Sequence, residues 1–362
     1  MKVLVGMSGG VDSTAACLLL KEQGHEVVGL TIRNNDIGLA DGSADAEPPY
    51  IHDARQLASK LGIGHYVTDE RERFERDVAG PFVRSWLDGM TPNPCIECNP
   101  RFKFSVLTEW AGRLGCDMIA TGHYAGIECV DGTYYVSRGS DRLKDQSYFL
   151  WKLPQDVLAR TVFPLGEMTK GQVKALVAES GLEIPSRESM EICFIEDDYR
   201  SYLRRRIPDI DKLIGPGKFV DSEGRVIGTH DGYPFYTTGQ RKGLKVAFGE
   251  PRYVLRTNPP KNTVMLGRPE ELQADCMLVG NALFTACRHG EYPDVEMNVM
   301  IRYHGSPVAC HIERIESDEM LLVRFHSPAQ AVTPGQYAVF YHGNRVVGGA
   351  AIVSQRGINQ YL

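Results

Sequence analysis

The sequence predicts an α/β protein in which an N-terminal domain with a parallel sheet is followed by a small, mostly β central domain and a C-terminal β-barrel. Strand-like and helix-like segments alternate in the first part of the chain. Near residue 205 they give way to short strands cut by glycine-rich turns. Because 362 residues are many for one domain, we predict three domains of 1–204, 205–272 and 273–362.

The apolar pattern of the first domain predicts its strands and helices. Three apolar, β-branched runs predict strands: 2–6, 26–32 and 117–121. Three helical patterns each end in glycine, which readily adopts the left-handed conformation at a helix end: 13–24, 52–62 and 102–115. Strands that alternate with helices in this way predict a parallel sheet with helices on both faces.

Two later segments carry signals of their own. Thr169 and Gln172 have the spacing of a capping box, which predicts a helix that begins there and closes at Gly181. From about residue 273, the segments VEMNVMIRY, LLVRF and QYAVFYHGNRVVGGAAIV alternate apolar and polar residues. Such alternation is typical of the strands of a β-barrel or sandwich.

Composition excludes several classes of protein. Apolar residues make up 43% of the chain, yet no apolar run approaches the roughly 20 residues of a spanning helix. MKVLVGMSGG starts a strand and breaks at glycine, so we expect no secretory signal. Nine scattered cysteines indicate free thiols, and we expect a cytoplasmic protein with no membrane partner. The net charge of the chain is −6, so its surface as a whole does not attract nucleic acid. Binding of nucleic acid would need local basic patches, such as 204–206 or 240–245.

The strongest local signal is GMSGGVDST at residues 6–14, which follows a strand and opens a helix. At such a junction, backbone N–H groups and the helix dipole favour an anion, and glycines let the backbone approach it. The segment lacks the lysine of the common P-loop and the G-x-G-x-x-G of dinucleotide folds. Asp12 adds negative charge, which suits a phosphate site only if it helps to hold a magnesium ion.

SGGVDS resembles the signature of the ATP pyrophosphatases, HUP-like enzymes that split ATP between the α and β phosphates and leave AMP on the substrate. Further segments occur in order: TPNP, ECN, ATGHYA, KDQSYFL, FPLGE, EICFI, TTGQRKGL and VTPGQYAVFY. Together they resemble the tRNA-specific 2-thiouridylase family nearly from end to end. That family replaces the oxygen on carbon 2 of the wobble uridine (position 34) of tRNA with sulfur, using ATP and a sulfur relay.

The resemblance implies roles for individual residues. Cys193 is the persulfide carrier, and Cys98 frees the sulfur or resolves the product as a Cys98–Cys193 disulfide. The residues implied in ATP binding are Gly6, Met7, Ser8, Gly9, Gly10, Val11, Asp12, Ser13, Ile32 and Gly122. Those implied in tRNA binding are Asn93, Pro94, Cys95, His123, Lys144, Asp145, Gln146, Arg302, Tyr303 and Gln336.

The same resemblance implies cofactors and partners. ATP and Mg²⁺ serve the activation step, and tRNA is the substrate. The sulfur comes from a donor protein, either a cysteine desulfurase or a sulfur-relay carrier. An end-to-end match to a tRNA enzyme favours a monomer.

The cysteines support a relay on chemical grounds. One thiol must carry a persulfide and a second must resolve it, and both react as thiolates. Cys98 precedes a basic helix start with Arg101 and Lys103, which favours its thiolate. Cys193 follows an irregular polar stretch that suits a flexible loop.

Cys95 departs from the family pattern, because many members have an aspartate there that suits acid–base help. A thiol can replace that carboxylate only if its pKa is lowered. Alternatively, Cys95, Cys98 and Cys193 hold an iron–sulfur cluster or a zinc ion, with an open position for sulfide. The sequence favours a relay without metal over a cluster and leaves the role of Cys95 open.

Two other functions stay open on the same fold. An amidating ligase would need an ammonia source and has no use for Cys193. A non-catalytic RNA-binding or metal-sensing module would bind tRNA without converting ATP to AMP and pyrophosphate. The identity of the sulfur donor and of the modified tRNAs is also open at this point.

Overall fold

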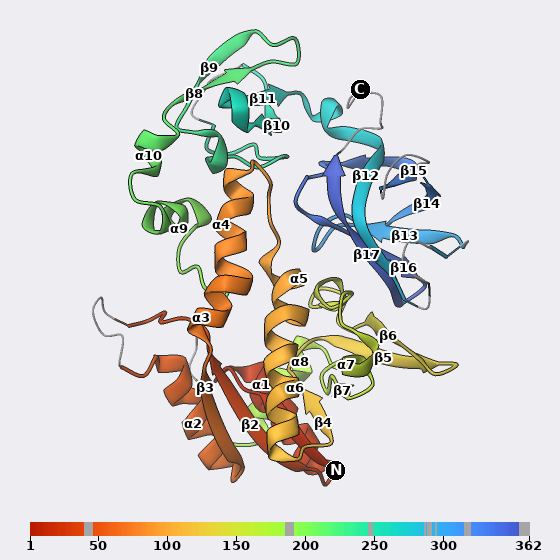
Figure 1. Cartoon of the computed structure of the whole chain (residues 1–362). Helices are drawn as coiled ribbons and strands as arrows, with labels where there is room; N and C mark the ends of the chain where they lie inside the picture. The colour runs from red at the N-terminus through yellow and green to blue at the C-terminus, as the bar shows by residue number, and fades with distance from the viewer. Residues whose placement is uncertain are drawn as a thin grey trace. The chain divides into compact units, whose positions relative to one another are not determined.

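The computed structural model describes residues 1–39, 46–184, 192–244, 249–285, 287, 292–293, 295–314 and 320–354. The chain forms two compact units (Figure 1). Unit 1 comprises Met1–Ala79, Pro94–Glu196 and Asn344–Val347, and unit 2 comprises Gly80–Asn93, Asp197–Gly343 and Gly348–Leu362. Because the chain leaves unit 1 at residue 80 and returns at 94, these units do not follow sequence order, and the predicted domain boundaries stay predictions.

A five-stranded parallel sheet lies at the centre of unit 1, in the order β3-β2-β1-β4-β7 (Figure 1). Its strands are β1 (Lys2–Gly6), β2 (Glu26–Arg33), β3 (Gly64–Asp69), β4 (Met118–Ala120) and β7 (Thr161–Val162). The three predicted strands and their parallel arrangement are confirmed. Sequence reasoning missed β3, whose residues are mostly polar, and β7, which is only two residues long.

Helices cover both faces of this sheet. The helices of unit 1 as a whole are α1 (Val11–Glu22), α2 (Pro49–Leu61), α3 (Arg71–Phe74), α5 (Pro94–Cys98), α6 (Phe104–Leu114), α7 (Gln155–Leu158), α8 (Lys170–Glu179), the π-helices Glu75–Ala79 and Asn99–Lys103, and the 3₁₀ helix Ser147–Phe149. Leu20 of α1 and Leu57 of α2 pack in one core with Val3 of β1. The Cβ position of Gly6 is on the opposite face of the sheet, next to the side chain of Leu107 of α6, because alternate strand residues face opposite sides.

Local sequence signals indicate a helix cap and a turn in unit 1. The capping box of α8 is confirmed, since Thr169 Oγ1 accepts from the Gln172 N–H and the Gln172 side chain accepts from the Thr169 N–H. A hairpin of β5 (Ala125–Val130) and β6 (Thr133–Arg138) was not predicted. Its turn residues Asp131 and Gly132 both have positive φ, as an Asp-Gly turn of type I′ requires, so the signal was present in the sequence.

Unit 2 contains a small four-stranded sheet in the order β10-β11-β8-β9. Its strands are β8 (Gly217–Val220), β9 (Val226–His230), β10 (Tyr253–Asn258) and β11 (Thr263–Gly267), and its helices are α4 (Gly80–Leu87), α9 (Tyr199–Arg206) and α10 (Ile210–Leu213). Trp86 of α4 stacks on Tyr199 at the start of α9, with ring centroids 4.0 Å apart. Aromatic packing therefore joins the segment 80–93 to unit 2.

The C-terminal strands of unit 2 form a closed β-barrel, as predicted. Its strands are β12 (Gln273–Phe284), β13 (Met297–Met300), β14 (Val308–Arg314), β15 (Leu321–Gln330), β16 (Tyr337–His342) and β17 (Arg345–Ser354). They pair in the order β12-β15-β14-β13-β16-β17, and β17 pairs again with β12 to close the barrel. Among the described residues, no helix has the length and apolar character needed to cross a membrane.

The closure of the barrel depends on a glycine. Gly348 of β17 pairs with Phe284 of β12, and a Cβ there would lie 2.5 Å from the Leu283 carbonyl oxygen.

We expect Gly348→Ala to destabilise the barrel by about 1–3 kcal/mol, because a backbone atom cannot move aside easily. Calorimetric unfolding tests this, with Gly112→Ala as the control. Gly112 of α6 has open space around its Cβ position, so that substitution should stabilise the helix by about 0.5–1 kcal/mol.

Candidate functional site

The predicted ATP-binding residues gather at the carboxyl edge of the parallel sheet, where open α/β sheets bind ligands. Gly6 ends β1, residues 7–10 form the loop, and 11–13 begin α1. Ile32 lies near the end of the adjacent strand β2, and Gly122 follows β4. The fold thus brings three separate segments to one edge, and the binding of ATP by these residues stays a prediction.

Two glycines in this region let backbone segments pack directly against one another. Gly9 has a φ of 74°, and a Cβ there would lie 2.7 Å from the Tyr50 carbonyl oxygen in the first turn of α2. A Cβ on Gly122 would lie 2.7 Å from the carbonyl carbon of Asp12. The loop is therefore held on one side by α2 and on the other by the segment after β4.

Hydrogen bonds within the loop fix its shape before any ligand binds. The Ser8 N–H donates to Ser13 Oγ at 3.3 Å, and Ser13 Oγ donates to the Gly10 carbonyl oxygen at 3.1 Å. Thr14 Oγ1 donates to the same carbonyl oxygen at 2.9 Å. The first N–H groups of α1 have no partner within the helix, which makes this end attractive to an anion.

Asp12 has two partners that sequence reasoning missed. Its Oδ1 accepts a hydrogen bond from Tyr124 at 2.7 Å and pairs with Lys170 Nζ at 2.6 Å. Burial and the Asp12 carboxylate raise the pKa of Tyr124, so it stays a hydrogen-bond donor. Lys170 thus supplies from α8 the cation that the loop itself lacks. No local sequence signal connects either residue to Asp12, because Tyr124 and Lys170 lie 112 and 158 positions away.

A second group of residues surrounds Cys98, which ends α5. Cys95 lies one turn earlier, so both thiols are on one side of this helix. The chain then widens into the π-helix Asn99–Lys103, a geometry that often marks functional sites. The backbone N–H of Lys103 donates to the sulfur of Cys98.

The structure brings the three thiols predicted to react or bind metal close enough to interact electrostatically. Burial is the main cause that raises the pKa of Cys95 and of Cys98 to about 12; repulsion from Cys193 contributes to both shifts and repulsion from Cys95 to that of Cys98, while Lys103 opposes them. Burial also raises the pKa of Cys193, against the effects of Lys103 and Asn34. Cys193 keeps contact with solvent, although protein atoms crowd its sulfur. The polar stretch before it, 185–191, lies outside the described residues.

The expected effect of the basic helix start on Cys98 needs a correction. Arg101 turns away from the thiols and pairs with Glu97 at 2.8 Å, and Glu97 also binds Lys152 at 2.6 Å. Lys103 alone of the two predicted cations acts on the cysteines. Even so, the loss of hydration outweighs this ammonium group, and the thiols are mainly neutral in this state.

His123 connects the sulfur centre to the nucleotide loop. Its Nε2 lies 3.4 Å from Lys103 Nζ, and its Nδ1 lies 2.6 Å from Thr121 Oγ1. Burial and the nearby Lys103 hold the pKa of His123 well below its usual value, so the ring is neutral and Nε2 can accept from the ammonium. Because Gly122 touches Asp12, the adjacent residues Gly122 and His123 bridge the two halves of the site. The predicted tRNA contact of His123 stays a prediction.

Two of the three residues predicted from KDQ to bind tRNA have partners inside unit 1. Asp145 Oδ1 accepts from the Gly139 and Ser147 N–H groups at 3.2 and 3.0 Å. Gln146 Oε1 accepts from the Tyr124 N–H at 3.0 Å. Lys144 is exposed. The side chains of Asp145 and Gln146 therefore stabilise the local backbone, and the side chain of Lys144 is exposed to solvent.

The remaining residues predicted to bind tRNA fall in both units. Asn93 is the last residue of the first segment of unit 2, and Pro94 begins α5 in unit 1. Arg302 is exposed in unit 2, next to Tyr303, whose ring lies 3.9 Å from that of His304. Gln336 Nε2 donates to the Thr91 carbonyl oxygen at 2.8 Å, close in sequence to Asn93.

The basic run 204–206 has intramolecular partners. Arg204 pairs with Asp211 at 2.9 Å, and Arg205 pairs with Asp197 at 2.8 Å. Arg206 donates to the Tyr202 hydroxyl at 2.7 Å. Each of these three arginine side chains thus has a partner within unit 2, so the run is not simply a set of solvated charges.

The metal alternative concerns thiols that lie within the ranges described by the structure. Within those ranges, no group of three or more His, Cys, Asp or Glu side chains is arranged to hold a metal ion. Cys95, Cys98 and Cys193 are close, but in this arrangement they do not form a ligand set. Their assignment as cluster ligands stays a prediction.

Comparison with known families matches each predicted domain type. A family model described as "tRNA methyl transferase HUP domain" matches residues 1–197. One described as "tRNA methyl transferase PRC-barrel domain" matches 201–268, and one described as "Aminomethyltransferase beta-barrel domain" matches 275–352. The predicted order of a HUP-like domain, a small central domain and a β-barrel is confirmed.

Similar curated proteins align over almost the whole chain. The protein named tRNA-specific 2-thiouridylase MnmA 3 of Phocaeicola vulgatus is 50% identical, over 99% of this chain and 96% of its own. A protein of the same name from Bacteroides fragilis is 51% identical, over 99% and 95%. The tRNA-specific 2-thiouridylase MnmA of Cytophaga hutchinsonii is 42% identical, over 98% and 97%. The chain therefore belongs to the tRNA-specific 2-thiouridylase family.

Proposed function

We propose that this chain is an ATP-dependent sulfurtransferase that converts the wobble uridine of tRNA to 2-thiouridine. The observation that carries the proposal is the bridge between the two halves of the site. Gly122 packs on Asp12 of the nucleotide loop, and His123 contacts Lys103, which acts on the cysteines. An activation site and a sulfur site are thus joined through adjacent residues, in a chain related end to end to proteins named 2-thiouridylases.

In the first step, the loop of residues 6–13 binds the phosphates of ATP, with Lys170 as the nearby cation. The uracil oxygen attacks the α-phosphate and pyrophosphate leaves, so the oxygen becomes part of a good leaving group. The carboxylate of Asp12 and the hydroxyls of Ser8 and Ser13 are oxygen donors of the kind that Mg²⁺ prefers, and a bound Mg²⁺ would neutralise phosphate charge there. Ile32 and Gly122 complete the predicted nucleotide contacts.

In the second step, the outer sulfur of a persulfide on Cys193 attacks carbon 2, and AMP leaves with the C–O bonding electrons. The Cys98 thiolate then attacks Cys193 Sγ, the S–S bond to the product breaks, and its electrons stay on the sulfur of the thiouridine. A Cys98–Cys193 disulfide remains, which a cellular thiol reduces. A cysteine desulfurase or a sulfur-relay carrier reloads Cys193.

The target base must leave the anticodon stack before carbon 2 can be reached. We propose that Asn93, Pro94 and Cys95 line the pocket for this base. Lys144 of unit 1 and Arg302 of unit 2 are exposed cations that suit the tRNA backbone. We place the reaction in the cytoplasm and propose that the enzyme acts as a monomer.

Replacing either relay thiol is the direct test. We expect Cys98→Ser and Cys193→Ser each to abolish 2-thiouridine formation while the melting temperature stays close to the original, because a hydroxyl cannot carry or exchange sulfur. The measurement is nucleoside mass spectrometry of tRNA after reaction with ATP and a persulfide donor. Cys129→Ser is the matched control, since Cys129 is an exposed cysteine in β5.

A normal yield of 2-thiouridine with either relay variant would contradict the proposed mechanism. The same assay separates other activities, because methylation and oxygen-to-sulfur exchange change the nucleoside mass differently. AMP and pyrophosphate are measured in parallel. An amidating ligase would form them without changing tRNA, and a non-catalytic RNA-binding module would not form them.

The role of Cys95 is tested by removing its sulfur. With a pKa near 12, Cys95 is a neutral thiol that cannot act as a base in this state. We therefore expect Cys95→Ser to keep measurable thiolation activity, unlike the two relay variants. Anaerobic purification with iron and sulfide analysis is the accompanying measurement. A full iron complement that is lost together with activity in Cys95→Ser would favour the cluster instead.

Lys103 is expected to set thiol reactivity. An ammonium group favours thiolates, so Lys103→Met should raise the pKa of Cys193 further and move its alkylation profile to higher pH. At a fixed pH below the pKa, we expect the rate to fall about threefold to tenfold, which corresponds to about half a unit to one unit of pKa. Iodoacetamide labelling with peptide mass spectrometry measures this. Arg101→Met is the control, because Arg101 is 62% exposed and pairs with Glu97; equal profiles in both variants would contradict the role of Lys103.

A further inference from the structure

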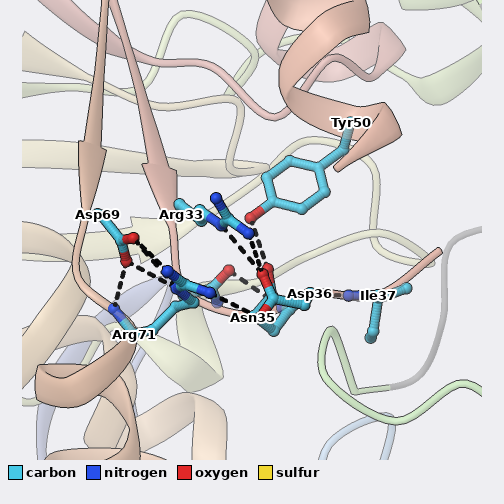
Figure 2. A network of polar contacts seen from close by, with 8 residues as sticks. Arg33, Asn35, Asp36, Ile37, Tyr50, Asp69 and Arg71 are labelled. Carbon is cyan, nitrogen blue, oxygen red and sulfur yellow. Dashed lines mark hydrogen bonds and ion pairs between the residues drawn. The ribbon is translucent and has the colours of Figure 1, made fainter. Parts of the chain in front are cut away.

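The loop after β2 is held by a network of charged groups that joins three elements (Figure 2). Asp36 accepts from Arg33 at the end of β2 at 2.6 Å and from Arg71 of α3 at 2.8 Å. Arg71 also pairs with Asp69 at the end of β3 at 2.7 Å. Burial raises the pKa of Asp36, but the hydrogen bonds from the two arginines outweigh it and leave the pKa below its usual value.

Asn35 completes the shape of this loop from within. Its Oδ1 accepts from the Ile37 N–H at 3.1 Å, and its carbonyl oxygen accepts from the Tyr50 hydroxyl of α2 at 3.2 Å (Figure 2). Single exposed ion pairs contribute little, but here one carboxylate is shared by two arginines and the backbone is anchored separately. Residues 34–38 are thus fixed from β2, α2 and α3 together.

The segment of Cys193 lies on this fixed loop. Asn35 Nδ2 donates to the Cys193 carbonyl oxygen at 3.4 Å, and Asn34 Nδ2 lies 4.0 Å from Cys193 Sγ, a long hydrogen bond to sulfur. The Gly38 N–H donates to Glu196 Oε1 at 3.1 Å. Four residues of the segment, 193–196, are therefore held at both ends.

An aromatic contact also holds the segment 193–196 in place. Phe194 is buried and meets Phe74 of α3 edge to face, with ring centroids 5.3 Å apart. Phe74 in turn packs against Phe102 of the π-helix that follows Cys98, at 5.1 Å. The charged and titratable groups that interact electrostatically with Cys193 are Lys103, Cys95 and Cys98. Phe194 thus links the segment of one relay cysteine to the helix of the other.

We propose that residues 34–38 form a seat for the segment 193–196, and that Asn34 and Asn35 are positioning residues that present the Cys193 sulfur to Cys98. The inference rests on the proposed function, because it takes Cys193 as the sulfur carrier. Cys98 and Cys193 are far apart in sequence, so their effective concentration depends on how the segment is held. Ile32, a predicted ATP contact, lies two residues before Asn34, so one strand end serves both the nucleotide and the sulfur.

The test measures the equilibrium constant of the Cys98–Cys193 disulfide in glutathione buffers. In this exchange, oxidised glutathione is reduced to two thiols as the protein disulfide forms, so the constant reports the effective concentration of the pair. All proteins are full length and carry Cys95→Ser, which removes a competing thiol. Samples are quenched, alkylated and read by peptide mass spectrometry, and the melting temperature of each variant is recorded.

We expect Asn34→Ala with Asn35→Ala to lower this constant about tenfold, the factor typical of two lost hydrogen bonds. The kcat of thiolation should fall in parallel while the KM for tRNA is unchanged. Glu196 supplies a second, independent pair of variants. Glu196→Ala should lower the constant about threefold, and Glu196→Gln, which keeps the acceptor for the Gly38 N–H, should restore it.

An unchanged constant in both the asparagine double variant and Glu196→Ala overturns the seat. Equal losses in Glu196→Ala and Glu196→Gln also overturn it, because the hydrogen-bond acceptor would then not matter. Cys193→Ser decides the proposed function separately. If that variant still thiolates tRNA, the relay is wrong; if it is inactive while the redox constants are unchanged, only the seat is wrong.

Discussion

The burial of thiols beside one ammonium group is the interaction on which this site depends. Lys103 acts on Cys95, Cys98 and Cys193, and in each case the loss of hydration outweighs it. A neutral thiol is a poor nucleophile, and Cys98, which is also buried, is shielded from oxidants. A bound group that removed the positive charge of Lys103 would raise the pKa of these thiols further. In the structure itself, the three thiols are mainly neutral.

The fold brings the residues of the two proposed chemical steps to one edge of the parallel sheet. The end of β1 carries the nucleotide loop, and the residues after β4 carry the bridge from Asp12 to Lys103. The end of β2 carries both a predicted nucleotide contact and the loop under Cys193. Each connection is only a few residues long. Short, packed connections of this kind transmit displacement well, because close-packed interiors deform little.

Much of the fold could be predicted from local patterns. Apolar runs found three strands of the sheet, the Thr169–Gln172 spacing found a capping box, and alternation found the barrel, because each is determined by neighbours in sequence. The partners of Asp12 could not be found this way: Lys170 is 158 positions distant, and nothing in its own segment points to Asp12. The resemblance implied that Asp145 and Gln146 bind tRNA, but it did not indicate that their side-chain oxygens accept from the backbone N–H groups of Gly139 and Tyr124.

The choice between Arg101 and Lys103 was also beyond sequence reasoning, and its cause is the π-helix Asn99–Lys103. A helix with ordinary spacing turns about 100° per residue, so the wider turn decides which side chain faces the thiols. It also aligns the Lys103 N–H with the Cys98 sulfur. The spacing of five positions between Cys98 and Lys103 therefore determines where the ammonium group lies. Loss or gain of one residue within it would rotate the ammonium about a quarter-turn away, so the number of residues between Cys98 and Lys103 matters as well as the lysine itself.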